Sequence, residues 1–202
     1  MDVSSKQWLS VVVEVMDAAR RGSKKEPDQR EVCAALVSRF RVSEGCARAV
    51  CEGIEGLFGF LSEEPGDGGN ALDDEREAMA MAMRLAAPLA QARMQKRADR
   101  SDAEVRGKAR CKSCGEGALS LGRRSKTWNG LGGKITLRRR VVHCAKCKCG
   151  SAPSEERMGL GDGEFTPRME EVSTLLGTTV PYQMASELLA KLLGVEVSVT
   201  GV

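Results

Sequence analysis

The stretches CKSCG (residues 111–115) and CAKCKCG (residues 144–150) each carry two cysteines separated by two residues. This spacing lets the backbone turn tightly enough to point both sulfurs at one ion. Thiolates are suitable ligands for zinc in closed, four-coordinate structural sites. We therefore expect one structural Zn²⁺ held by four cysteines: Cys111, Cys114, Cys144 and Cys147.

Other groups near the second pair leave alternatives open. Cys149 could replace Cys147, although a two-residue spacing is commoner in such knuckles than a four-residue spacing. His143, the only histidine, adjoins Cys144 on an expected strand and is read as a strand side chain. The alternative for the whole motif is a set of free thiols in a hairpin.

The eight cysteines are expected in a reducing cytoplasm. The chain has no apolar run of about 18 residues and no N-terminal pattern typical of a secretory signal, so no membrane association is expected. In a reducing compartment, paired cysteines favour metal binding over disulfides. Cys33, Cys46 and Cys51 lie outside the paired motifs at apolar helical positions, where we expect them to be buried as small hydrophobic side chains.

A β-hairpin is expected between the two cysteine pairs. The segments ALSLGRRSKTW (residues 118–128) and GKITLRRRVVHC (residues 133–144) have strand-type alternation, and NGLGG (residues 129–133) is a strong turn signal. Residues 105–152 are therefore predicted to form a small zinc ribbon.

Positive charge is concentrated on this segment. Residues 105–150 contain 13 Lys and Arg against the single acid Glu116, whereas the whole chain has a net charge of only +3. Alternating arginines place charge on both faces of a strand, which is hard to bury and is explained if phosphates lie alongside. Seven side chains are the expected DNA contacts: Arg123, Arg124, Lys126, Lys134, Arg138, Arg139 and Arg140. The alternative is a solvated ribbon that binds a protein.

The rest of the chain has helical patterns, which makes the expected fold mainly α with a small β zinc ribbon. Residues 1–62 should form a helical bundle, with a helix from Ser4 or Ser5 to Arg21, one after Pro27 and one capped by Ser43. The short link between the last two also resembles a helix-turn-helix corner. Residues 63–74 read as a linker, and 73–104 as a long helix that Pro88 should kink or divide.

The region 153–202 is expected to be a loop followed by helices. Thr166 should cap one helix, and a last helix should run from about Pro181 to Leu193 and end at Gly194. Ser198 would cap a further helix of scarcely one turn, so this end is predicted to be a truncated helix-turn-helix-like element. Leu188 and Leu192 should then be partly exposed, and sequence-specific DNA binding should be poor.

Residues 111–202 resemble the ISKra family of bacterial insertion-sequence transposases. The resemblance rests on the order of CKSCG, GRRSKT, GGKITLRRRVVHC, CAKC, GSAP, GLGDGEFTPRM and VPYQMASELLAKLLGVEVSVTGV. Two departures are Val142-His143, where the family usually has aromatic residues, and the additional Cys149.

The resemblance implies DNA binding, at transposon ends, by the non-catalytic N-terminal part of a transposase. It also implies a bacterial, cytoplasmic, nucleoid-associated protein whose further partners could be a full-length transposase or a second copy. The family's RNase H-like domain, with its Asp, Asp and Glu metal ligands, is missing, so no enzymatic activity and no catalytic residue are expected. Asp162, Glu170 and Glu187 are read as surface charge. The rivals are a regulatory DNA binder that competes with a full-length transposase and a zinc-ribbon adaptor that binds a protein.

Overall fold

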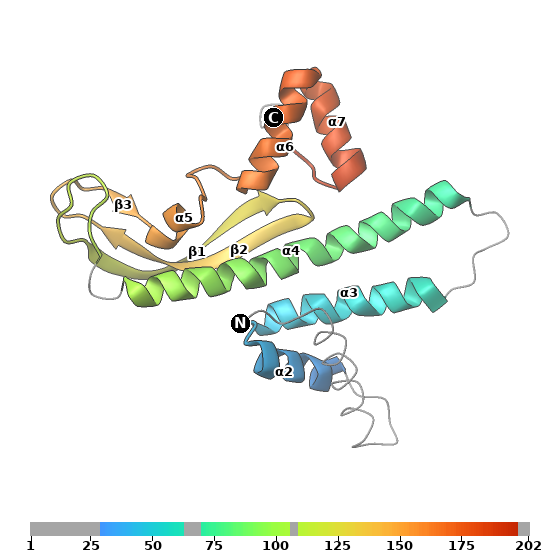
Figure 1. Cartoon of the computed structure of the whole chain (residues 1–202), viewed down its shortest axis with the longest axis horizontal. Coiled ribbons are helices and arrows are strands. Elements are labelled where there is room, and N and C mark those ends of the chain that lie inside the picture. Colours follow the sequence, from blue (N-terminus) through green and yellow to red (C-terminus); the bar gives the residue numbers. More distant parts are fainter. Residues whose placement is uncertain (1–28, 63–69, 106–108, 198–202) are drawn as a thin grey trace. The chain divides into compact units, whose positions relative to one another are not determined.

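The computed structural model describes residues 29–62, 70–105 and 109–197, which form two units. Unit 1 extends to Glu63 and unit 2 begins at Glu64. Within the described residues the chain is mainly helical, with one small antiparallel sheet, as the sequence predicts (Figure 1). None of the described helices combines the length and apolar character needed to cross a membrane.

Unit 1 contains two described helices, α2 (Gln29–Phe40) and α3 (Glu44–Ser62). Ser43 caps α3, because its hydroxyl accepts a hydrogen bond from the Cys46 amide at 3.3 Å, as expected for this residue type. The buried residues of α3 are Cys46, Ala47 and Cys51, while Cys33 on α2 is half-buried. The helix expected between Ser4 and Arg21 lies outside the described residues.

Unit 2 begins with the long helix α4 (Ala71–Glu104). Asn70 caps it by accepting hydrogen bonds from the Leu72 and Asp73 amides at 3.0 and 3.2 Å, so the helix starts two residues earlier than expected. Of the two effects expected of Pro88, a kink or a division of the helix, the division is wrong, because one helix runs through it.

The sheet has the order β1–β2–β3, with β1 at Leu119–Gly130, β2 at Gly133–His143 and β3 at Gly150–Ser151. The hairpin between β1 and β2 pairs Gly130 with Gly133, which confirms the turn expected from NGLGG. A register shift between Ser120 and Arg123 marks a bulge around Gly122, whose φ is +87°.

Helix α4 covers the free edge of β2 with side chains in place of a further strand. Gln91 accepts from the Thr136 amide at 2.7 Å, Gln95 from the Arg138 amide at 2.9 Å, and Asp102 from the Arg140 amide at 2.9 Å. Gln95 also donates to the Arg138 carbonyl at 2.8 Å.

These bonds satisfy alternate amides that would otherwise leave an unpaired strand edge. Gln91, Gln95 and Asp102 lie on one face of α4, so their side chains can reach the amides of alternate residues in β2.

The main core of unit 2 lies between the sheet, α4 and the chain that follows β3. Its buried members are Ala87, Trp128, Ile135, Leu137 and Leu160. Burial in β2 alternates from Ile135 to Arg139, which confirms the period-two reading of that segment.

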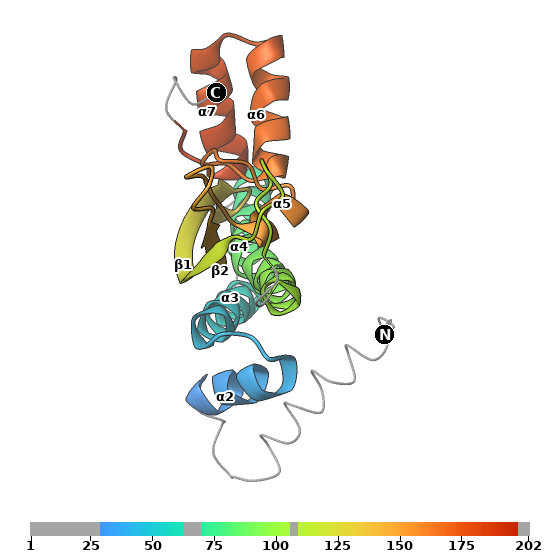
Figure 2. The ribbon, with the colours of Figure 1, turned by 90° about the vertical axis from the view of Figure 1, so that its left-hand side faces the viewer.

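The C-terminal part contains α5 (Pro153–Arg157), α6 (Pro167–Thr179) and α7 (Tyr182–Leu193). The loop expected after Gly150 is thus partly wrong, because α5 interrupts it. Thr166 is at the N-cap of α6 as expected, but its side chain makes no capping hydrogen bond. Helices α6 and α7 lie side by side in both views (Figures 1 and 2).

Helix α7 ends at Gly194, whose φ is +63°, as the sequence predicts. Leu189 is buried against Met169 and Val195, whereas Leu192 is 61% exposed and Leu188 is half-buried. The expected partial exposure of Leu188 and Leu192 is confirmed. The further short helix expected after Ser198 lies outside the described residues.

Gly132 in the hairpin turn is expected to be intolerant of substitution. Its φ is +83°, and a Cβ there would lie 2.5 Å from the Met83 carbonyl oxygen and 2.9 Å from the Ala86 Cβ. We expect Gly132→Ala to cost roughly 3–5 kcal/mol, because backbone strain and overpacking against α4 add. Urea denaturation measures this cost.

Gly122 provides the matched control, since its φ is +87° and a Cβ there would meet nothing within 4 Å. Gly122→Ala should cost only the strain, about 1–2 kcal/mol. Equal costs for the two variants would contradict the close approach of the turn to α4.

Candidate metal centre and basic hairpin

The two cysteine pairs form turns of the same design. In the first, the Cys111 amide donates to the Glu116 carbonyl at 2.7 Å, and in the second the Cys144 amide donates to the Cys149 carbonyl at 2.9 Å. The residue after the second cysteine has positive φ in both turns, +72° at Gly115 and +55° at Lys148. Each turn therefore reverses the chain within six residues and presents two sulfurs on the same side.

Four sulfurs meet between these turns. The Sγ atoms of Cys111, Cys114, Cys144 and Cys147 all lie within 4.8 Å of one another, and they form the one metal-sized cluster of His, Cys, Asp and Glu among the described residues. The Cys111–Cys147 and Cys114–Cys144 separations are 3.9 and 3.6 Å. These values bracket the edge of a tetrahedron with metal–sulfur bonds of about 2.3 Å, which is roughly 3.8 Å. The cluster can therefore bind a metal ion, as the spacing predicts.

The pKa values of Cys111 and Cys147 are shifted by their neighbours. The Cys114 backbone amide, together with the Cys149 thiol, lowers the pKa of Cys111 to about 6. The pKa of Cys147 is raised well above its ordinary value, first by its hydrogen bond with Cys114. Four thiolates this close repel one another, and a divalent cation between them removes the penalty.

Cys149 is a fifth thiol beside the cluster. Its Sγ lies 3.3 Å from the Cys111 Sγ, but it is not a member of the four-sulfur group. In the second turn Cys149 occupies the position that Glu116 occupies in the first, beyond the positive-φ residue. The equivalence of the two turns therefore favours Cys147 as the fourth ligand. His143 lies on β2, paired with Leu119 and Gly150, and is also outside the group.

One face of the hairpin is covered, and two of its basic residues, Lys126 and Arg139, have partners there. Arg139 is buried, donates through Nε to Glu155 and through Nη1 to the Arg124 carbonyl at 2.8 Å. Lys126 donates to the Gly161 and Asp162 carbonyls at 3.4 and 3.3 Å, and its Nζ lies 4.8 Å from the centre of the Trp128 ring.

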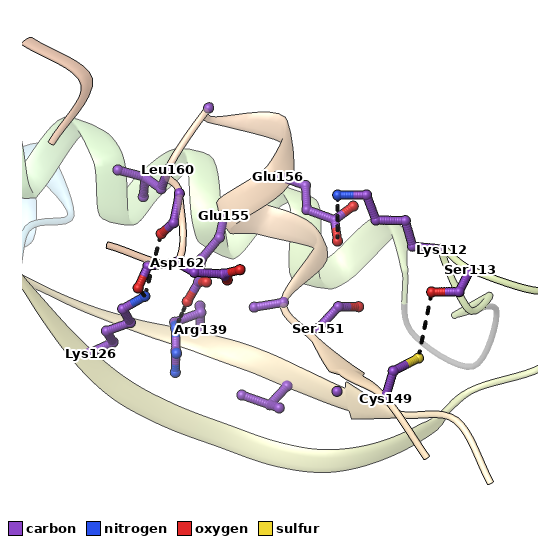
Figure 3. Close-up of a pocket in the computed structure, with 15 residues that line it drawn as sticks. Lys112, Ser113, Lys126, Arg139, Cys149, Ser151, Glu155, Glu156, Leu160 and Asp162 are labelled. Carbon is purple, nitrogen blue, oxygen red and sulfur yellow. Dashed lines mark hydrogen bonds and ion pairs between the residues drawn. The ribbon is translucent and has the colours of Figure 1, made fainter. Parts of the chain in front are cut away.

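These groups line a cavity of about 640 Å³ beside α5, which we call the α5 pocket (Figure 3). Its three basic residues, Lys112, Lys126 and Arg139, stand against three acids, Glu155, Glu156 and Asp162. The pocket therefore offers no net positive charge to a phosphate. The expectation that the hairpin arginines are hard to bury is wrong for Arg139, which is buried beside Glu155.

Two further arginines are engaged by neighbouring elements. Arg123 forms ion pairs with Asp99 and with Asp102 of α4, the latter at 3.2 Å, and its side chain is 34% exposed. Arg140 donates through Nη1 to the Ser120 hydroxyl at 2.8 Å and is half-buried. Arg123 therefore connects the hairpin to α4, whereas Arg140 connects β2 to β1.

The opposite face of the hairpin is solvent-exposed and polar. Thr127 pairs with Thr136 across the strands, with their hydroxyl oxygens 2.8 Å apart, and Ser125 pairs with Arg138. Lys134, Thr136 and Arg138 are exposed at alternate positions of β2, and Arg140 continues the row. We call this surface the open face; its residues are Ser125, Thr127, Lys134, Thr136, Arg138 and Arg140. Arg124 is exposed on the covered side of β1.

Sequence reasoning missed three of the residues that position this surface. Gln91, Gln95 and Asp102 fix β2 from α4, and a signal existed in their shared helix face, which also carries the buried Ala87 and Ala98. The acids Asp162, Glu170 and Glu187 are exposed, as expected.

Comparison with known proteins adds no relative: no family model, no curated protein and no solved structure matches this chain.

Proposed function

We propose that the chain binds DNA through the open face of its hairpin, and that a Zn²⁺ ion in the four-cysteine cluster holds the hairpin's base together. The observation that carries the proposal is the exposure of Lys134 and Arg138 at alternate positions of β2 on the open face. Arg139 on the covered face is paired with Glu155, and Lys126 is bonded to two backbone carbonyls, whereas Lys134 and Arg138 on the open face are exposed. Unneutralised cations in a row attract a phosphate backbone.

The chemistry of the open face favours contacts with phosphate and sugar over reading of bases. Its residues are hydroxyl-bearing or basic, with no aromatic ring for base stacking. Alternate residues of a strand recur every ~6.8 Å, so Lys134, Thr136, Arg138 and Arg140 form a ladder of donors along one line. Such a surface binds duplex DNA with little sequence preference.

In this proposal the cluster is structural. Four cysteine ligands close the coordination shell of zinc and leave no position for a substrate. The two turns bracket the hairpin, because one precedes β1 and the other follows β2. The sequence resemblance adds the biological setting, namely end binding by the non-catalytic part of a transposase or by a regulator that competes with one.

The test removes charge from the open face alone. Lys134→Ala combined with Arg138→Ala should weaken binding to a random-sequence 30-base-pair duplex by about 10-fold to 100-fold at moderate salt, and should flatten the salt slope by roughly two. Fluorescence anisotropy at several salt concentrations measures both quantities.

The matched control removes two positive charges from the α6–α7 hairpin, by Arg168→Ala combined with Lys191→Ala, both exposed. It should leave affinity within about threefold of wild type, since these residues are outside the open face. An equal loss in the control would assign DNA binding to the helices or to net charge alone.

A second candidate function is a protein-binding adaptor. The α6–α7 hairpin exposes four large apolar side chains: Leu175, Tyr182, Met184 and Leu192. Exposed apolar groups of this kind are typical of protein-contacting surfaces. An adaptor would bind its partner with little salt dependence, which distinguishes it from the DNA-binding proposal.

A further inference from the structure

A second pair of cysteines lies in unit 1, remote in sequence from the metal cluster. Cys33 on α2 and Cys51 on α3 are 18 positions apart, and their Sγ atoms are 3.0 Å from each other. Both are free thiols, Cys33 half-buried and Cys51 buried. The two helices therefore already hold the sulfurs close to bonding distance.

The core around Cys33 and Cys51 is small. In the described part of unit 1 the fully buried apolar residues are Cys46, Ala47 and Cys51, which is a small core. Four large side chains in the second half of α3, Ile54, Leu57, Phe58 and Leu61, are 39% to 67% exposed. The described part of unit 1 has little buried surface, so a covalent cross-link between its two helices would stabilise it.

We propose that Cys33 and Cys51 form a reversible disulfide that joins α2 to α3, and that this pair is a redox modification site separate from the metal cluster. In a reducing compartment the pair stays as two thiols, and it closes when the thiol–disulfide poise becomes oxidising. The disulfide would add a covalent link between α2 and α3, which the chain otherwise connects only through the short segment before α3.

The reaction needs a disulfide of a small thiol, such as oxidised glutathione, as the oxidant. The thiolate of Cys33, the more accessible sulfur, attacks the glutathione disulfide and releases one glutathione thiolate. The thiolate of Cys51 then attacks the Cys33 sulfur of the mixed disulfide and releases the second. Both cysteines are oxidised, one glutathione disulfide is reduced to two glutathione thiols, and the two protons lost by the cysteines pass to the released glutathione thiolates.

Burial, followed by the contact with Cys33, raises the pKa of Cys51 to about 12. The second step therefore depends on the short sulfur–sulfur distance, because little Cys51 thiolate is present at neutral pH.

Cys46 is the natural competitor, because it is buried on the same helix as Cys51. The short sulfur–sulfur contact nevertheless joins Cys51 to Cys33. Among the described residues the metal-sized cluster is the one in unit 2, so the unit 1 cysteines do not form a comparable metal site.

The test uses the full chain, loaded with zinc, with and without oxidised glutathione. After alkylation, trypsin releases the three unit 1 cysteines in separate peptides, at residues 31–39, 42–48 and 49–76. We expect peptide 31–39 disulfide-linked to peptide 49–76 and reversal by dithiothreitol. Amides of α2 and α3 should exchange at least about tenfold more slowly in the oxidised chain.

Two variants keep the result interpretable. Cys46→Ser should form the same link, while Cys33→Ser should form none and show no slowing of exchange. A link that includes Cys46, glutathione retained on Cys33 without closure, or oxidation confined to the unit 2 cysteines would each overturn the proposal. DNA affinity is measured separately, so this result is independent of the proposed function.

Discussion

Replacement of Cys144 by serine is expected to abolish stoichiometric zinc binding and to unfold both cysteine turns. The Cys144 sulfur is buried, lies 3.6 Å from that of Cys114 and belongs to the four-sulfur group. Structural zinc in thiolate modules contributes about 10–16 kcal/mol of binding energy, most of which is folding energy. Metal analysis should fall from one zinc per chain to near zero, and the turn amides should exchange as in an unfolded chain.

The matched control is Cys149→Ser, which removes the fifth thiol and leaves the four-sulfur group complete. This variant should keep one zinc per chain and protected turns. Loss of zinc in Cys149→Ser, with zinc retained in Cys147→Ser, would show that Cys149 is the fourth ligand and that the two turns are not equivalent.

Breaking the buried pair of Arg139 and Glu155 is the second large effect. Their side chains are 10% and 11% exposed, and the pair joins β2 to α5 on the covered face. Glu155→Leu leaves the largely buried Arg139 guanidinium without its carboxylate partner, which should destabilise unit 2 by roughly 3–5 kcal/mol. Urea denaturation of this variant and of Arg139→Met measures the effect.

The double variant, Arg139→Met with Glu155→Leu, removes both charges and should recover most of the lost stability. It should also bind DNA as well as wild type, because Arg139 does not face the open side. Additive losses in the double variant would show that the two side chains do not interact as a pair.

The hairpin and the four-cysteine cluster were predictable because their signals are local. The Ile135-Thr136-Leu137 alternation, the glycines of the turn and the cysteine spacing each specify backbone geometry over a few residues. The capping roles of Ser43 and Gly194 were predictable for the same reason.

The interactions of the hairpin arginines were not predictable, because each depends on a partner distant in sequence. Arg139 is neutralised by Glu155 of a five-residue helix in a glycine-rich stretch that reads as a loop. Arg123 is paired with acids of α4, 21 to 24 positions earlier. Ion pairs of this kind depend on tertiary packing. From sequence alone, such arginines are therefore too readily predicted to contact DNA.

The edge contacts of α4 illustrate a second limit. Glutamine is common on solvated helix faces, and nothing local distinguishes Gln91 or Gln95 from a surface residue. Their role follows from the position of β2 beside the helix, where two unpaired amides need acceptors.

The salt dependence of wild-type binding to random duplex DNA tests the central claim most directly. An open face that contacts phosphates through Lys134, Arg138 and Arg140 should give a plot of log affinity against log salt with a slope of about −2 to −3. The Lys134→Ala/Arg138→Ala variant should have a slope close to −1. A wild-type slope near zero, or no binding at the lowest salt, would contradict the proposal that this hairpin binds DNA.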